Sequence, residues 1–369
     1  MSNTPAPLRI ALVAPPWIPV PPRGYGGIEA MLADLAGTLV RRGHDVVLIG
    51  AGENGTPARF LTTYAEPPTA RLGGSMPEVV HAARAARYLD RLKVDVVHDH
   101  SLAGPLTARG RRTPTVITAH GPVDGEVGLY YRNLGGSVSL VAISNAQQRL
   151  APDLNWSATV HNAVEVEAFP FRDDKEDFVL FLGRCHPDKG VHLAIDAARA
   201  AGRRILLATK INESAERDYF EAEIEPRLGP GVEHLGEANT TLKRELLAAA
   251  YCLAFPIQWE EPFGMVMIEA MACGTPVVAI GKGAVPEVVV DGVTGFVRDK
   301  PDELPEAIDA AGRLSPAACR EHTRQHFDVD VMVAGYEQVY DALTGPRLER
   351  HHDALSGPRL ESHYAALTG

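Results

Sequence analysis

The chain alternates short apolar runs with longer amphipathic stretches. Leu8 to Ala14 is mostly apolar, contains branched side chains and ends at two prolines, which is typical of a buried strand. The stretch opened by Gly26 and Gly27 then repeats apolar residues at helical spacing, from Ile28 to Leu39, and ends near residue 43. Further strands are predicted at 45–50, 94–97, 116–119 and 140–143, with a helix at 79–92.

The same cycle restarts after a charged stretch at residues 173–177. Strands are predicted at 178–182, 204–208, 232–235, 252–255 and 277–280, with a helix at 191–201. Buried strands separated by helices indicate parallel sheets covered on both faces. We therefore predict an α/β protein with two Rossmann-like, doubly wound parallel-sheet domains, joined near residues 163–177. A ligand is expected in the crevice between them, at the carboxyl ends of both sheets.

Composition agrees with a two-domain globular protein. The 369 residues exceed the ~250–300 that one core usually fills, and 45% of them are hydrophobic. The net charge of −11 argues against a nucleic-acid binder. The four cysteines are far apart, which argues against disulfides or a zinc ribbon and favours a reducing compartment. The sequence shows no membrane segment or export signal, so a cytoplasmic location is expected.

Basic residues in the first half of the chain give one indication of a negatively charged binding partner. Residues 1–164 carry 15 Lys or Arg and 12 Asp or Glu, an excess of three positive charges. Arg84, Arg87 and Arg91 recur on one face of a predicted helix. An acidic membrane surface or an anionic acceptor would suit these charges, but a solvated face is the simpler interpretation.

The most informative motif is Glu261-Pro-Phe-Gly-Met-Val-Met-Ile-Glu269, followed by Ala-Met-Ala-Cys-Gly-Thr-Pro. A helix is expected to begin near Phe263–Gly264 and to stop at Cys273, before a strand. Glu261 then lies at the helix start, beside free backbone N–H groups that attract an anion. Glu269 lies further along, where a carboxylate can hold vicinal hydroxyls, and Gly264 leaves room for a ligand. The alternative is a capping carboxylate and a solvated glutamate.

A second motif, Gly-Arg184-x4-Lys189-Gly, follows a predicted strand and precedes a helix. An arginine fork and a lysine point charge on such a loop can grip two phosphates. By themselves, both residues would be interpreted as surface cations.

A third motif is the glycine-rich turn Arg-Gly-Tyr-Gly26-Gly27-Ile-Glu, which opens the first long helix and permits close approach by a ligand. It is not Gly-x-Gly-x-x-Gly, so the dinucleotide fingerprint is missing.

Histidines follow two predicted strands of the first domain. His120 is expected to face the crevice, although a lone histidine there is more often structural. His98 and His100 fall on one face and would suit a metal together with His120, but no carboxylate or cysteine spacing supports a metal site. Asp328-Val-Asp330 resembles a metal-binding Asp-x-Asp, but helix capping is the better interpretation.

The tail repeats itself. Residues 341–352 recur as 353–364, and a partial third copy follows. A Gly-Pro pair every twelve residues limits each copy to a short helix. We interpret residues 346–369 as a repeat-bearing extension that would serve docking or homo-oligomerisation.

Taken together, these motifs resemble the family-4 retaining glycosyltransferases, whose GT-B architecture consists of two Rossmann-like domains. The resemblance covers about residues 8–345. It rests on the Glu-x7-Glu block, the Gly-Arg-x4-Lys-Gly loop and the Gly-Gly turn. Residues 94–101 and 175–183 resemble the antibiotic-tailoring branch typified by the avilamycin glycosyltransferase.

The resemblance implies a role for each motif residue. Arg184 and Lys189 would bind and stabilise the donor diphosphate, and His120 would reach the 6-hydroxyl of the sugar. Glu261 would contact hydroxyls of the donor sugar, and Glu269 would contact the ribose. The remaining donor-binding positions are the backbone amides of Phe263, Gly264, Met265 and Val266, and the glycines Gly26 and Gly27. The segment Gly283-Ala-Val-Pro-Glu287 matches a family segment near the sugar.

It also implies an organisation and a reaction. Residues 1–165 would form the acceptor domain, 166–320 the nucleotide-sugar domain, and 321–345 a helix crossing back to the first domain. The expected reaction moves glucose or mannose from a UDP- or GDP-sugar to a saccharide or small-molecule hydroxyl, with retention and without metal or other cofactor. Two alternatives are left open. One is a non-catalytic sugar-nucleotide binder, and the other is a different GT-B enzyme, such as an epimerase or phosphorylase. A nicotinamide oxidoreductase is disfavoured by the missing fingerprint.

Overall fold

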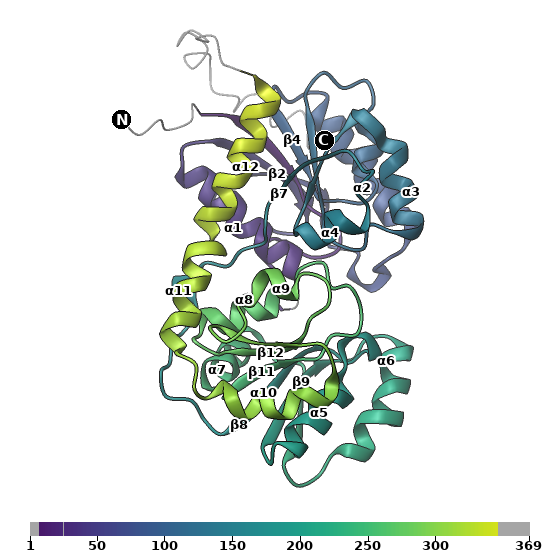
Figure 1. Cartoon of the computed structure of the whole chain (residues 1–369). Helices are drawn as coiled ribbons and strands as arrows, with labels where there is room; N and C mark the ends of the chain where they lie inside the picture. Colours follow the sequence, from purple (N-terminus) through teal and green to yellow (C-terminus); the bar gives the residue numbers. More distant parts are fainter. Residues whose placement is uncertain (1–6, 25, 346–369) are drawn as a thin grey trace, which may run out of the picture.

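Two parallel sheets, one in each half of the chain, form the framework of the molecule (Figure 1). The computed structural model describes residues 7–24 and 26–345. The prediction of two Rossmann-like α/β domains is confirmed by this arrangement. Tyr25 of the glycine-rich turn and the predicted repeat-bearing tail at 346–369 lie outside the described residues.

The N-terminal sheet has seven strands in the order β3-β2-β1-β4-β5-β6-β7, all of them parallel. Its strands are β1 (Arg9–Val13), β2 (Asp45–Ala51), β3 (Arg59–Tyr64), β4 (Val96–Asp99), β5 (Thr115–Ala119), β6 (Ser139–Ala142) and β7 (Trp156–Thr159).

The C-terminal sheet has six strands in the order β10-β9-β8-β11-β12-β13, again all parallel. They are β8 (Phe178–Arg184), β9 (Arg204–Lys210), β10 (Val232–Gly236), β11 (Cys252–Phe255), β12 (Val277–Ile280) and β13 (Gly295–Arg298).

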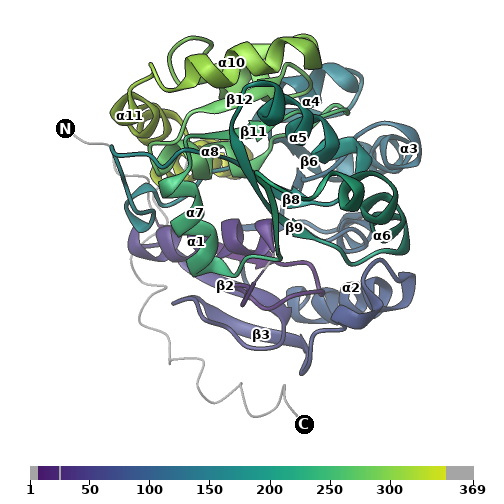
Figure 2. The same ribbon diagram turned by 90° about the horizontal axis from the view of Figure 1, so that it is seen from below.

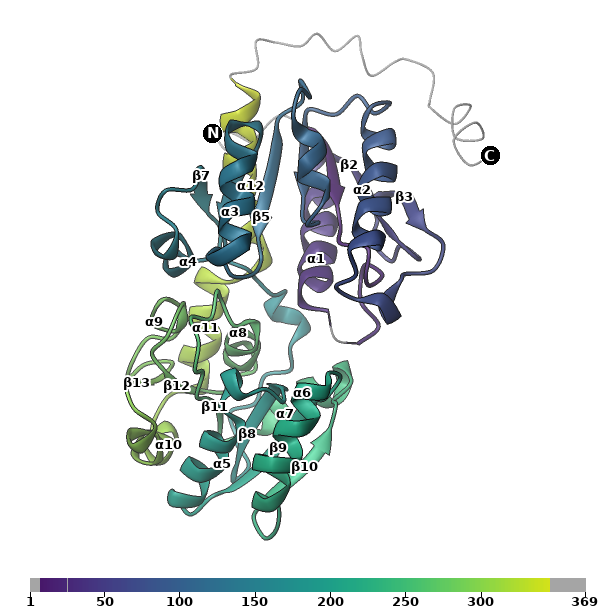
Figure 3. The same cartoon turned by 90° about the vertical axis from the view of Figure 1, so that its right-hand side faces the viewer.

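Helices flank the strands of both sheets (Figures 2 and 3). Those of the N-terminal half are α1 (Gly27–Arg41), α2 (Ser75–Leu89), α3 (Gly125–Leu134) and α4 (Asn145–Leu150). The others are α5 (Val191–Ala200), α6 (Ser214–Tyr219), α7 (Thr240–Ala249), α8 (Met265–Ala272), α9 (Val285–Val288), α10 (Leu304–Ala311), α11 (Pro316–His326) and α12 (Val329–Thr344).

Strand β12 shows why the central strands are apolar without interruption. Val277 and Ala279 join the core that includes α7 and α8, whereas Val278 and Ile280 join the core that includes α5 and α10. Successive side chains of a strand point to opposite faces. Both faces of this sheet are therefore buried.

The C-terminal segment consists of two helices. Helix α11 packs against α8, and α12 packs against α1 and β4 of the N-terminal domain. Asp328 separates them because its backbone is extended and its carboxylate accepts the amides of Asp330 and Val166. The capping interpretation of Asp328 is thus confirmed. Tyr336 and Tyr340 of α12 are fully buried in the N-terminal core.

Three strands were not expected from the sequence, namely β3, β7 and β13. Strands β3 and β7 lie at the two edges of the N-terminal sheet, and β13 lies at one edge of the C-terminal sheet. Edge strands carry fewer buried apolar side chains, and β7 has none that is fully buried. The hydrophobic pattern that marks a central strand is therefore weak there.

Candidate active site

The centre of the candidate site is an ion pair between Lys189 and Glu261. The Nζ atom of Lys189 lies 2.5 Å from Oε2 of Glu261, and the indole N–H of Trp259 donates to the same oxygen at 3.1 Å. The ammonium also lies 5.2 Å from the centre of the Trp259 ring. Both charged side chains are mostly buried, with 23% and 11% of their surface exposed. The structure thus joins two separately predicted motifs.

Local backbone geometry explains why Lys189 can reach this position. Lys189 ends a 3-10 turn after β8, and Gly190 follows with φ of 68°. A side chain at Gly190 would meet the carbonyl group of Pro256, just after β11. Only glycine fits both the left-handed backbone and this close approach.

Arg184 lies at the end of β8 and is held by carboxylates of the α6 region. Its Nε donates to Glu216 at 2.6 Å, and its Nη2 donates to Glu213 at 3.1 Å. Glu216 is almost fully buried, and its pKa is lowered because hydrogen bonds from backbone amides and from Arg184 outweigh the effect of burial. Sequence reasoning did not find these two glutamates, because they come from a neighbouring strand-to-helix connection.

Glu269 on α8 is paired with Lys243 on α7 at 2.7 Å. The Glu269 carboxylate is 13% exposed, so it is not the solvated glutamate that the alternative interpretation required. Lys243 was missed from the sequence, because only the packing of α7 against α8 brings the two residues together.

Helix α8 begins as expected, next to Glu261. Gly264 is its N-cap, with φ of 84°, and a side chain there would meet Met267 and Phe255. Glycine is therefore required by the backbone conformation as well as by close packing. Phe263 is buried, whereas Met265 is partly exposed.

The predicted Gly-Gly turn lies against this helix start, across the domain boundary. A Cβ atom built on Gly27 would lie 4.0 Å from Cγ of Met265. Gly26 is the N-cap of α1. The first helix of the N-terminal domain and α8 of the C-terminal domain therefore approach each other at their N-termini.

His120 directly follows β5, is partly buried, and lies beside the buried histidines His98 and His100 at the end of the N-terminal sheet. Its Nε2 lies 2.8 Å from Nδ1 of His100, and His98 contacts Tyr340 and Thr118 at 2.7 and 2.8 Å. Burial lowers the pKa of His120 to about 4 and those of His98 and His100 well below 6.5. All three imidazoles are therefore neutral at pH 7.

These histidines do not assemble a metal site in the structure. Within residues 7–24 and 26–345, no group of three or more His, Cys, Asp or Glu side chains is arranged to hold a metal ion. The four cysteines are all free and buried. No helix in these ranges is both long and apolar enough to cross a membrane.

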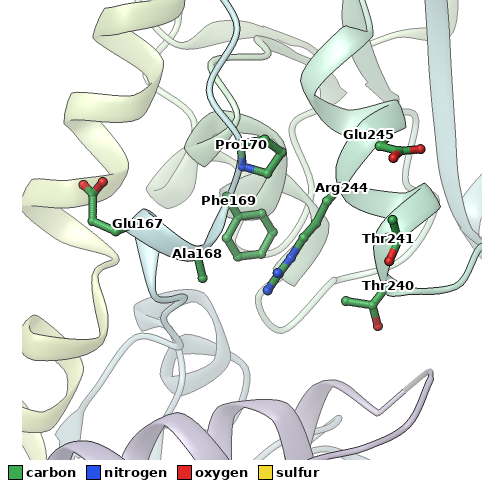
Figure 4. Close-up of a pocket in the computed structure, with 8 residues that line it drawn as sticks. All are labelled: Glu167, Ala168, Phe169, Pro170, Thr240, Thr241, Arg244 and Glu245. Atoms are coloured by element: carbon green, nitrogen blue, oxygen red, sulfur yellow. The ribbon is translucent and has the colours of Figure 1, made fainter.

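An open cavity of about 500 Å³ lies between the interdomain linker and α7 (Figure 4). Figure 4 shows Arg244 extending past the ring of Phe169, whereas Glu245 points away. The guanidinium carbon lies 4.9 Å from the Phe169 ring centre. Glu167 at the cavity edge is paired with Arg320 and Arg324. None of the site residues predicted from the sequence lines this cavity.

This geometry places cations and a helix N-terminus together at the carboxyl ends of the C-terminal strands. Lys189 and the start of α8 are suited to bind an anionic group, and Arg184 lies on the same strand-to-helix loop as Lys189. The carboxylates of Glu261 and Glu269 are suited to accept hydrogen bonds from hydroxyls.

Comparisons with known proteins agree with this arrangement. The family model "Glycosyltransferase Family 4" matches residues 25–166, and "Glycosyl transferases group 1" matches residues 165–325. The chain is 28% identical to alpha-maltose-1-phosphate synthase of Mycobacterium tuberculosis over 340 residues, covering 78% of this chain and 84% of the relative. It is 26% identical to glycogen synthase of the same organism, covering 93% and 96%. The crystal structure of AviGT4, a glycosyltransferase involved in avilamycin A biosynthesis, superposes with a TM-score of 0.71 at 28% identity, covering 92% of this chain and 99% of AviGT4.

Proposed function

Because the chain belongs to the family-4 glycosyltransferases with the GT-B fold, we propose that it moves a hexose from a UDP- or GDP-sugar to a hydroxyl of a saccharide or small-molecule acceptor. Glucose and mannose are the favoured sugars. A saccharide acceptor is supported by the names of two relatives, which are synthases of alpha-maltose-1-phosphate and of glycogen.

The observation that carries the proposal is the Lys189–Glu261 pair at the start of α8. Breaking the bond between a sugar and a nucleotide leaves a diphosphate and an oxocarbenium-like sugar. In the donor complex, Lys189 and the α8 amides would face the departing diphosphate, and Glu261 would accept hydrogen bonds from sugar hydroxyls. Fixed positive groups aimed at the developing charge lower such a barrier.

Arg184 would complete the phosphate site by exchanging one of its carboxylate partners for a phosphate oxygen. Glu213 is the partner more easily released, because its side chain is 64% exposed, whereas that of Glu216 is 1% exposed. Glu216 would keep the guanidinium in place during this exchange.

His120 would act as a neutral hydrogen-bonding group for the sugar. Its pKa of about 4 keeps the imidazole uncharged at pH 7, so it would not repel the oxocarbenium-like centre. Because Lys189, Arg184 and α8 supply positive potential, we propose that no metal is needed. We further propose retention through a front-face reaction, in which the leaving phosphate helps to deprotonate the acceptor.

The first test is binding and turnover of donors without any acceptor. We would measure thermal shifts with UDP, GDP, ADP and NAD in EDTA, and then hydrolysis of UDP-glucose and GDP-mannose. A ligand at about 100 times its Kd adds about 2.7 kcal/mol of stability. A shift with UDP or GDP together with slow hydrolysis supports the transferase. Binding without turnover favours the non-catalytic sugar-nucleotide binder, and a shift with NAD alone refutes the proposal.

Two variants test the phosphate site directly. Losing one group that stabilises a transition-state charge typically costs ~10²–10³ in rate. We therefore expect Arg184→Ala and Lys189→Ala each to slow donor turnover by about that factor. Lys93→Ala is the matched control, since Lys93 is exposed in the N-terminal domain. Near-normal turnover in both site variants would contradict the assignment of Arg184 and Lys189 to the phosphate site. If EDTA abolished turnover and added Mg²⁺ restored it, the proposal that no metal is needed would be wrong.

A further inference from the structure

Glu287 connects the two domains. It lies at the end of α9 in the C-terminal domain, yet its carboxylate contacts α4 of the N-terminal domain. Oε2 accepts the backbone N–H of Asn145 at 2.8 Å and its side-chain amide at 3.1 Å, and Oε1 accepts the backbone N–H of Ala146 at 2.5 Å. Arg149 of the same helix lies 3.4 Å away.

The backbone amides that Glu287 contacts are the first amides of α4, which need a hydrogen-bond acceptor from outside the helix. The first N–H groups of a helix have no partner within the helix. In α4, the Ser144 side chain accepts the amide of Gln147, and Glu287 accepts the two preceding amides. Burial alone would raise the pKa of Glu287, but hydrogen bonds from His161 and from these amides lower it overall. Glu287 is therefore a carboxylate held by a complete set of donors.

The other end of α9 is fixed to the candidate active site. The backbone N–H of Gly283 donates to Oε2 of Glu260 at 2.8 Å, and the N–H of Ala284 donates to the carbonyl of Glu261 at 2.9 Å. The N–H of Glu287 in turn donates to the carbonyl of Ala284 at 2.9 Å. A short, continuous hydrogen-bonded path therefore runs from Glu261 to α4 of the other domain.

His161, which follows β7 just before the interdomain linker, joins the same group. His161 Nε2 lies 3.3 Å from Oε2 of Glu287, and the His161 ring lies 5.9 Å from the ring of Phe263, next to the start of α8. The Glu287 side chain is only 15% exposed. One carboxylate thus contacts α4, the segment just before the linker and, through α9, the loop that carries Glu261.

We propose that Glu287 is a positioning residue that fastens the Glu261 loop to α4 and holds the two domains in the arrangement seen in this structure. The resemblance to family 4 places the 283–287 segment near the sugar, but the Glu287 carboxylate is occupied by the N-terminal domain. That Glu287 affects donor binding rests on the proposed function. That it holds the two domains in place does not.

The test changes the contact from each side. Glu287→Gln removes the charge at nearly constant size. Asn145→Pro removes two donors to Glu287, and proline is well tolerated at the first position of a helix after an extended residue such as Ser144. Glu306→Gln is the matched control, because Glu306 is an exposed helical glutamate in the C-terminal domain.

Energy transfer between dyes on α3 and α6 reports the domain arrangement. These helices lie on the side of the molecule opposite α11 and α12 (Figure 1). Glu126→Cys and Asp218→Cys supply exposed labelling positions, and the four native cysteines are buried. Without any ligand, we expect Glu287→Gln and Asn145→Pro to lower transfer, because the equilibrium constant for the observed arrangement falls about tenfold. The Glu306→Gln control is expected to match wild type.

Donor kinetics separate positioning from a general loss of structure. If fewer molecules hold the competent arrangement, the donor KM rises by the factor by which that population falls, whereas kcat stays within about twofold. We would use UDP-glucose and GDP-mannose, whichever is turned over. Unchanged transfer in both variants would overturn the proposal. Changed transfer in a protein that turns over neither donor would keep the positioning role and refute the proposed transfer from UDP-glucose or GDP-mannose.

Discussion

Gly283 offers a sharp test of how tightly the active-site loop is packed. Its φ is 56°, in the left-handed region, and a Cβ atom there would lie 2.8 Å from the carbonyl carbon of Glu261 and closer still to its backbone N and O. Gly292 provides the matched control, because it has a φ of 74° but open space around its missing side chain. Alanine at either position has the same unfavourable conformational energy, because both backbones are left-handed. Only Gly283→Ala adds the clash with Glu261.

The magnitude follows from these contacts. The left-handed conformation costs roughly 1–2 kcal/mol for a residue with a Cβ, and this cost is common to both variants. To relieve the clash, α9 must move away from Glu261 and lose the Gly283–Glu260 and Ala284–Glu261 hydrogen bonds, at about 1 kcal/mol each. Overpacking adds about 1–3 kcal/mol. We therefore expect Gly283→Ala to be about 3–5 kcal/mol less stable than Gly292→Ala.

Urea unfolding of the two variants, followed by circular dichroism, measures this difference. With an m-value of about 2 kcal/mol/M, the midpoints should differ by about 1.5–2.5 M. Because Glu261 is displaced with the loop, binding of UDP or GDP should also weaken at least tenfold in Gly283→Ala alone. If the two variants unfold within about 1 kcal/mol of each other, the inferred close packing of α9 against Glu261 is wrong.

Two further predictions concern a partly buried lysine and a buried histidine away from the donor site. Lys175 donates hydrogen bonds to the carbonyls of Ala248 and Cys273 and to the Thr275 hydroxyl, at 2.8, 3.0 and 3.0 Å. We therefore expect Lys175→Met to lower the free energy of unfolding, measured in urea, by about 3 kcal/mol. A loss below about 1 kcal/mol would contradict these contacts. Burial lowers the pKa of His81 to about 4, so the unfolded chain takes up the proton first as the pH falls below 6.5. The stability advantage of wild type over His81→Asn should therefore shrink by up to about 3 kcal/mol between pH 6.5 and 4, and a pH-independent difference would refute this reasoning.

Much of the fold was accessible from local sequence pattern. The predicted strands at 252–255 and 277–280 coincide with β11 and β12, because central strands of a parallel sheet are apolar on both faces. The helix predicted at 79–92 begins earlier, at Ser75, because Pro77 lies in its first turn, where proline is tolerated. Of the four edge strands, β10 was predicted at 232–235, whereas β3, β7 and β13 lacked the pattern and were missed.

The chemistry of the candidate site was accessible only in part. Glu261, Lys189 and Gly264 were identified because their types and spacing match a helix start and a strand-to-helix loop. Neither motif indicated that Lys189 pairs with Glu261, which lies 72 positions away in the sequence. The roles of these residues in donor binding stay predictions until the variants are measured.

The sequence by itself determined the alternation of strands and helices, the glycines of the three motifs, and the residue types at the candidate site. These features depend on side-chain periodicity and on backbone sterics within a few residues. Only the tertiary structure decided that Lys243 holds Glu269, that α12 buries Tyr336 and Tyr340 in the first domain, and that Glu287 reaches Asn145. Such contacts depend on how helices are rotated about their axes and how the two domains are placed, which no local pattern encodes.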